Sequence, residues 1–213
     1  TFLLAIISFS YLCPNNYNYL MEKDSLVIFD KNVIEFVTVA AETCGFLERT
    51  ETLSKDEFVD TSLKMLPLLY LKANLLPPCV AIEEEDLEHF VSEEVYEIIR
   101  INIASVLADK DDYLEVFLPE MRYSDTPIKK NVSEDLADIY QDLKNFVFIF
   151  QLGFNQTMHD ALVRCKNNFA EYWGQRLVNS LRALHDIKYN TTNPEGDDED
   201  LYNEEPFEDD LLF

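Results

Sequence analysis

The sequence predicts an all-α protein, a single antiparallel bundle of five to six helices with a long C-terminal helix and a disordered acidic tail. Apolar residues recur every three to four positions through most of the chain, and the strict alternation typical of strands is scarce. The 213 residues include only 4 glycines, the residue that supplies the positive-φ positions of hairpins. A hydrophobic content of 47% is enough to form the core of one domain of this length.

Two helices are expected in the first third of the domain. The first spans about residues 31–50 and carries an apolar stripe of Val33, Val37, Ala40, Cys44 and Leu47. The second follows a capping box at 54–57, where the Ser54 hydroxyl and the Glu57 carboxylate can each accept a hydrogen bond from a free backbone N–H. Pro67 should kink or split this helix, and Pro77 with Pro78 should end it.

A third helix is expected to begin at Ser92, because serine followed by two glutamates is a favourable helix start. Its predicted stripe is Val95, Ile99, Asn102 and Val106. The acidic segment 83–91 before it should be a turn or short helix. Residues 111–117 after it are likewise predicted to form a short helix or turn.

The fourth helix should begin at Ser133, with a stripe of Leu136, Tyr140, Leu143, Val147 and Phe150. Further apolar residues at Phe148 and Ile149 predict burial on more than one side, as in a central helix. Gly153 should close it. In the last helix, 157–188, the apolar stripe drifts by about a quarter turn beyond Gly174, which indicates a bend or a close approach there.

The chain is expected to divide into residues 1–20, a helical domain at 21–190 and an acidic tail at 191–213. The apolar run 2–12 is too short to span a bilayer. We therefore expect Met21 as the start, with an upstream extension before it; a truncated signal peptide or a first helix are the alternatives. Residues 195–210 hold ten carboxylates and no basic residue, which favours a disordered tail, either solubilising or used for interaction.

The net charge, the glycines and the cysteines of the chain exclude some classes of function and indicate the cellular compartment. A net charge of −24 speaks against nucleic acid and against an anionic membrane surface as partners. The isolated glycines exclude a P-loop and a dinucleotide-binding fingerprint, and no cofactor or metal motif is present. The 4 cysteines are far apart, and we expect buried, reduced thiols in a cytoplasmic protein.

Pairs of acidic residues are the first candidates for a metal-binding or catalytic site. Glu94 and Glu97, followed by Asp112 and Glu115, loosely resemble the Mg²⁺ site of helical nucleotide pyrophosphatases, but the glutamates fall opposite Ile99 on a face expected to be solvated. Asp138 and Asp142 fall opposite the apolar stripe of their helix in the same way. Asp135 lies in the first turn of that helix, where its negative charge interacts favourably with the helix dipole. The histidines, His89, His159 and His185, are tied by no motif to a serine or cysteine.

The most unusual local feature is the segment 172–176. Arg176 falls on the same helix face as Phe169 and Trp173, where a guanidinium needs a carboxylate or an aromatic partner. It either forms an internal ion pair between two helices or provides a pocket for an anionic group or a peptide carboxylate. The candidate binding residues are Trp173, Arg176, Tyr172, Asp135, Asp138, Tyr113, Arg182 and His185.

Several strings in the sequence resemble one known family. YLEVF at 113–117, SEDLADIY at 133–140, Trp173-Gly174 and LRALH at 181–185 are similar to the helical domain of unknown function 5063 over about residues 28–189. The resemblance implies a bacterial, cytoplasmic, all-helical domain. It implies no reaction, cofactor or site residue.

Three functions remain open from the sequence. The first is a non-enzymatic helical interaction domain that binds a protein partner, a basic one by charge, through a groove near Trp173. The second is a metal-dependent hydrolase of a phosphorylated small molecule, which requires Asp112, Glu115, Asp135 and Asp138 to converge. The third is an anionic-ligand sensor that uses Arg176 and Arg182.

Overall fold

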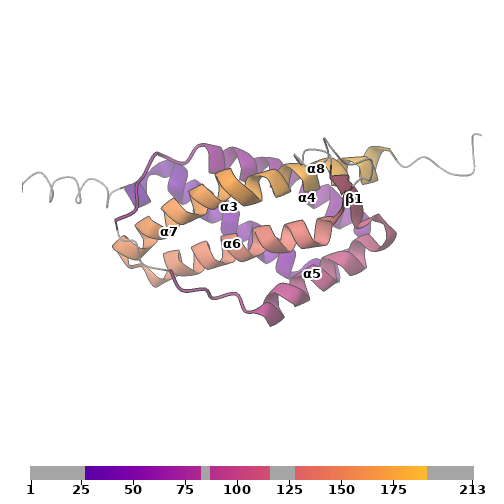
Figure 1. The fold of residues 1–213 in the computed structure, drawn as a ribbon, viewed down its shortest axis with the longest axis horizontal. Coiled ribbons are helices and arrows are strands. Elements are labelled where there is room, and N and C mark those ends of the chain that lie inside the picture. The colour runs from indigo at the N-terminus through magenta and orange to yellow at the C-terminus, as the bar shows by residue number, and fades with distance from the viewer. Residues whose placement is uncertain (1–26, 83–86, 116–127, 191–213) are drawn as a thin grey trace, which may run out of the picture.

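The chain folds as the predicted all-α antiparallel bundle in a computed structural model, which describes residues 27–82, 87–115 and 128–190 (Figure 1). The expected upstream extension and the acidic tail lie outside these residues. The α-helices are α3 (Lys31–Glu48), α4 (Lys55–Asn74), α5 (Glu93–Leu107), α6 (Val132–Leu152), α7 (Asn155–Asn168) and α8 (Gly174–Tyr189). Short 3-10 turns lie at Val27–Phe29, Thr50–Thr52 and Ala108–Lys110, a π-helical turn lies at Phe169–Trp173, and the two strands are β1 (Asp112–Glu115) and β2 (Ile128–Asn131). No helix in these ranges is both long and apolar enough to cross a membrane.

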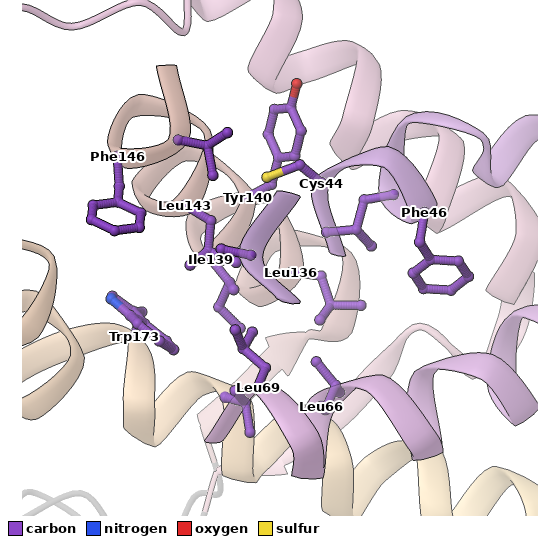
Figure 2. Packing of buried hydrophobic residues seen from close by; sticks show 14 of the residues in the cluster. Cys44, Phe46, Leu66, Leu69, Leu136, Ile139, Tyr140, Leu143, Phe146 and Trp173 are labelled. Carbon is purple, nitrogen blue, oxygen red and sulfur yellow. The ribbon is translucent and has the colours of Figure 1, made fainter. Parts of the chain in front are cut away.

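Helix α6 is the centre of the bundle, as its wide apolar surface predicts. It packs against α3, α5, α7 and α8, and it runs antiparallel to the continuous rod of α7 and α8 (Figure 1). Its core residues include Leu136, Ile139, Leu143 and Phe146, which face Cys44 of α3, Leu69 of α4 and Trp173 (Figure 2). Burial on several sides therefore places α6 in contact with most other elements of the fold.

Helix α4 begins with the predicted capping box: the Ser54 hydroxyl accepts from the Glu57 N–H, and the Glu57 carboxylate accepts from the Ser54 N–H. Of the two alternatives predicted for Pro67, a kink or a split, the split is wrong, because α4 continues through Pro67 to Asn74. Proline removes a single backbone donor. The buried side chains of Leu66 and Leu69, on either side of it, keep both halves against the same core.

The side of α5 that is buried differs by about one residue position from the predicted apolar stripe. The buried side chains are Ile99, Ile103 and Leu107, whereas Val95 is 38% exposed. The helix carries isoleucines on both sides, since Ile98 and Ile101 are exposed, so periodicity alone did not identify the side that is buried. The Ser92 hydroxyl caps the helix as predicted by accepting from the Val95 N–H.

The chain before α5 is held by side chains rather than by helical hydrogen bonds. Of the segment 83–91, residues 83–86 lie outside the described ranges and 87–91 form no helix. Asn145 of α6 accepts hydrogen bonds from the backbone N–H groups of Phe90 and Val91. Asp160 of α7 accepts one from Ile82. Tertiary partners thus satisfy the backbone groups that a short helix would have used.

Residues 112–115 form a strand, so the prediction of a short helix or turn over 111–117 is wrong where the structure describes it. β1 pairs antiparallel with β2, and Tyr113 and Glu115 point toward the bundle while Asp112 and Leu114 point outward. Asp111, just before β1, caps α6: its carboxylate accepts hydrogen bonds from the Ser133 N–H (2.8 Å) and hydroxyl (2.6 Å). Four residues are too few for a periodic signal in the sequence.

A π-helical turn at Phe169–Trp173 joins α7 to α8 and explains the drift of the apolar stripe. The Gly174 N–H donates to the carbonyl of Phe169, five residues back. One extra residue in a turn rotates everything after it by about 100° around the axis. Gly174 is required here by close approach, since a Cβ would lie 2.4 Å from the Phe169 carbonyl oxygen.

The thiols of Cys44 and Cys165 are buried, as expected for reduced core cysteines. Burial raises the pKa of the Cys44 thiol to about 12 and also raises the pKa of Cys165. Both side chains pack in the hydrophobic core and act as small apolar residues.

Candidate functional site

Arg176 of α8 joins two carboxylates of α6. Its Nη1 lies 2.7 Å from Asp135 Oδ1 and 3.0 Å from Asp138 Oδ2. The two aspartates are three residues apart and therefore share one face of α6. The guanidinium also lies over the ring of Tyr172, with Cζ 4.3 Å from the ring centroid. The sequence allowed two roles for Arg176, an internal ion pair or a pocket for an anionic group. The structure contains the internal ion pair.

Three tyrosines complete this group, which we call the Arg176 cluster: Arg176, Asp135, Asp138, Tyr113, Tyr172 and Tyr96. The Tyr113 hydroxyl on β1 donates to Asp135 Oδ2 at 2.5 Å. Asp138 accepts from Tyr172 at 3.0 Å and from Tyr96 of α5 at 2.9 Å. The cluster thus ties the hairpin, α5 and α8 to the first turns of α6.

The electrostatics of the cluster reflect its burial. Burial raises the pKa of the Asp135 carboxyl, and the hydrogen bonds from Tyr113 and Arg176 only partly oppose this. Burial also raises the pKa values of Tyr113 and Tyr96. The negatively charged aspartates that accept hydrogen bonds from these two hydroxyls raise the pKa values further. For Arg176, burial alone would lower the pKa, but the charge of Asp138 and the bond to Asp135 outweigh it and raise it.

Tyr96 was not among the site residues predicted from the sequence. The prediction for Asp138, a position on a solvated helix face, is wrong. Asp138 does not lie on a solvated face, because its side chain is largely buried against Tyr96, Tyr172 and Arg176. Tyr96 lies 42 residues from Asp138 in sequence. Nothing local in the sequence links the two; only the packing of α5 against α6 brings them together.

A metal-dependent hydrolase is not supported by this arrangement. In the described ranges, no three acidic, histidine or cysteine side chains gather where they could hold a metal ion. The oxygens of Asp135 and Asp138 are taken by Arg176 and tyrosines, Asp112 pairs with Lys129, and the Glu115 carboxylate accepts from Asn179. The four carboxylates that this function requires are therefore engaged by other side chains of the protein and do not gather around one position.

An open pocket of about 730 Å³ lies beside the cluster, between α8 and β1, and we call it the α8–β1 pocket. Arg182, His185 and Tyr113 from the predicted set line it. Glu115 and Asn179, both buried and joined by a 2.7 Å hydrogen bond, also line it. The remaining lining residues are Asp109, Lys110, Asp112, Leu114, Ala183, Asp186, Ile187 and Asn190.

Trp173 belongs to the hydrophobic core and is not part of a binding surface. Its side chain is fully buried among the core residues (Figure 2). Its ring lies 4.6 Å from that of Phe169, and its Nε1 has no hydrogen-bond partner in the described part of the chain. A partner could not contact this ring in the folded protein. The accessible surface nearest to the predicted residues is therefore the α8–β1 pocket.

The eight predicted site residues thus fall into three places. Arg176, Asp135, Asp138, Tyr172 and Tyr113 lie in the Arg176 cluster. Arg182 and His185 line the α8–β1 pocket, where Tyr113 is shared with the cluster, and Trp173 lies in the core. No single motif in the sequence joins these residues.

Comparisons with known proteins agree with the resemblance seen in the sequence. The family model described as Domain of unknown function (DUF5063) matches residues 27–190. The crystal structure of protein BF1032 from Bacteroides fragilis is similar, with 60% sequence identity and a TM-score of 0.70, and the match covers 78% of this chain and 98% of that chain. No curated protein matches the chain.

Proposed function

This chain belongs to the DUF5063 family, and on that premise we propose that it is a non-enzymatic interaction domain that binds a basic segment of a partner protein. The α8–β1 pocket is the proposed binding site. We place this domain in the bacterial cytoplasm, with neither nucleic acid nor a membrane as its partner. The observation that carries the proposal is an open pocket lined, within the described ranges, by one side of α8 and by β1.

The side of α8 that lines the pocket supports a macromolecular partner. The lining residues of α8 include Asn179, Arg182, Ala183, Asp186 and Ile187, whose spacing of three and four residues marks one side of a helix. Ala183 and Ile187 are apolar, and the others can form hydrogen bonds or ion pairs. A surface with an apolar strip between polar residues is typical of sites that bind peptide segments.

The charge of the pocket favours a basic segment. Asp109, Asp112, Glu115 and Asp186 line it together with two cations, Lys110 and Arg182. The chain as a whole carries a net charge of −24, which attracts cationic partners and repels nucleic acid.

An array of twelve-residue peptides of varied net charge, probed with the full chain, tests this function. We expect basic peptides to be enriched by the unaltered chain. Ala183→Trp, which fills the pocket, should reduce their binding at least about tenfold. Thr38→Trp on the exposed outer side of α3 is the matched control and should bind normally.

A charge reversal at the rim supplies a second test if the tryptophan disturbs folding. Asp186→Lys changes an exposed side chain and should weaken binding of basic peptides. An array with no enriched peptide, or with binding unaffected by both Ala183→Trp and Asp186→Lys, contradicts the proposal.

An anionic ligand is the second candidate, because Lys110, Arg182 and His185 line the same pocket. Arg176 does not support it, since its guanidinium is occupied by two aspartates. Acidic peptides enriched on the array, with loss of binding in Arg182→Glu and not in Asp186→Lys, would favour this candidate over the first.

A further inference from the structure

We propose that the basic segment binds as an extended strand that adds to the edge of β1 facing away from β2. This inference rests on the proposed function and specifies the form of the partner. Strand addition recognises the backbone of a peptide through the unpaired N–H and C=O groups of an edge strand, and side chains provide the specificity.

The pairing of β1 with β2 determines which backbone groups are free. The Val132 N–H donates to the Asp111 carbonyl at 2.8 Å, and the register continues with Tyr113 opposite Lys130. Paired backbone groups alternate along an antiparallel strand. The N–H and C=O of Asp112 and Leu114 therefore point to the other edge, away from β2.

This other edge borders the α8–β1 pocket. All four residues of β1 line the pocket, and neither Lys129 nor Lys130 of β2 does. The side chain of Leu114 is 56% exposed, and its N–H and C=O have no hydrogen-bond partner in the described ranges. In the part of the chain that the structure describes, this edge is unpaired and lies next to a half-buried side of α8, which together provide the backbone partner and the apolar floor for a peptide.

The side chains around the edge indicate which residues the strand should carry. β2 carries Lys129 and Lys130, and Lys129 pairs with Asp112, so β1 already accepts a basic strand on one edge. A strand on this edge would place every second residue on the outward face that Asp112 and Leu114 share, and one of these residues would lie beside the Asp112 carboxylate. The residues between them would face Ala183 and Ile187 of α8. The expected pattern is an alternation of lysine or arginine with small apolar residues.

The probe that tests the inference is a capped eight-residue peptide that alternates Lys and Val. Its binding to the full chain can be measured by calorimetry, beside a Glu–Val peptide of the same length. Two further versions carry N-methyl groups on the four lysines or on the four valines, which removes the N–H groups along one edge. We expect the Lys–Val peptide to bind, the Glu–Val peptide to fail, and at least one methylated version to bind at least about tenfold more weakly.

Leu114 provides a matched pair of variants. Leu114→Pro removes the outward N–H without removing a ladder hydrogen bond, and proline is tolerated at edge strands. It should reduce binding at least about tenfold, whereas Leu114→Ala, which keeps the N–H, should bind within about threefold of the unaltered chain. On binding, hydrogen exchange at the Leu114 amide should slow at least about tenfold, while the already paired Lys130 amide should not change.

Several outcomes would overturn strand addition. If the Lys–Val peptide binds but neither methylation weakens it and the Leu114 amide gains no protection, the segment binds in another form. The proposed function would then stand. If this peptide fails to bind, the predicted alternation is wrong, and the peptide array decides the proposed function separately. Binding that is equal in Leu114→Pro and Leu114→Ala also contradicts the inference.

Discussion

The guanidinium of Arg176 lies 2.7 Å from the carboxylate of Asp135, and this contact joins α8 to α6 across 41 residues of sequence. The Asp135 side chain is only 2% exposed, so its charge is balanced by protein groups rather than by water. The contact connects the core of the bundle to the wall of the α8–β1 pocket, because Tyr113 both donates to Asp135 and lines the pocket.

Replacing Arg176 by methionine should lower the free energy of unfolding by about 3–5 kcal/mol, because it leaves Asp135 and Asp138 buried without their cation. Arg176→Lys should cost less but not restore full stability, since an ammonium cannot reproduce the planar guanidinium over Tyr172. Urea denaturation measures both. Arg182→Met, at an exposed position, is the control and should change stability by about 0.5 kcal/mol or less. Equal stability of the two methionine variants would contradict this role for Arg176.

Two glycine substitutions should have opposite effects. Gly174→Ala places a Cβ 2.4 Å from the Phe169 carbonyl oxygen and should cost roughly 1–3 kcal/mol as the π turn shifts. Gly45→Ala, in the last turn of α3, meets only the end of Arg49 at 3.5 Å and should stabilise the protein by about 0.5–1 kcal/mol. Thermal unfolding followed by circular dichroism compares them. A Gly174→Ala protein as stable as Gly45→Ala would show that close approach does not constrain this position.

Asp111→Ala should destabilise the protein by about 1–2 kcal/mol, because the N-terminus of α6 loses the acceptor for the Ser133 N–H. Asp111→Asn keeps a side-chain oxygen at this position and should retain most of the stability. Chemical denaturation measures the difference. If the alanine and asparagine variants are equally destabilised, charge rather than the capping hydrogen bond is the cause.

Asp142 and Asp135 should add stability as the pH falls from neutral toward the ordinary aspartate pKa. Burial raises the pKa of both carboxyls, so the folded state binds protons more readily than the unfolded state as the pH falls through the raised values. Their contribution is complete below the ordinary aspartate pKa and is lost as the pH rises through the raised value. Half-buried Glu35, whose pKa the hydrogen bond from Lys72 lowers, acts in the opposite direction and loses its contribution under more acidic conditions.

Asp142→Asn isolates this effect. As the pH falls from 7 toward the ordinary aspartate pKa, the melting temperature of the variant should increase less than that of the unaltered chain. Glu42→Gln, which removes an exposed carboxylate from α3, is the control and should leave the increase unchanged. A pH profile that is the same in all three proteins would exclude Asp142 as its source.

The thiols of Cys44 and Cys165 should resist alkylation in the folded protein at about pH 8. Burial raises both pKa values and excludes the reagent, so the reactive thiolate is scarce at both positions. Iodoacetamide treatment followed by peptide mass spectrometry should show modification at these two sites only after denaturation. Rapid labelling of either site in the native protein would contradict its place in the core.

The sequence by itself determined the helical class, the main helix starts and one helix end. The Ser54–Glu57 capping box, the Ser92 cap and the Gly153 helix end all form as predicted. Each depends on hydrogen bonds or backbone angles within about four residues, and such local chemistry can be read from neighbouring letters. The family resemblance was equally readable, because it depends on strings of consecutive residues.

Only the tertiary structure decided which side of α5 is buried, where the hairpin forms and how the Arg176 cluster is assembled. Tyr113 and Asp135 are 22 residues apart, and Tyr96 and Asp138 are 42 apart. Their contacts depend on the packing of whole helices, which a single sequence does not specify locally. The α8–β1 pocket has the same origin, since it lies between elements that the chain brings together only after the bundle has formed.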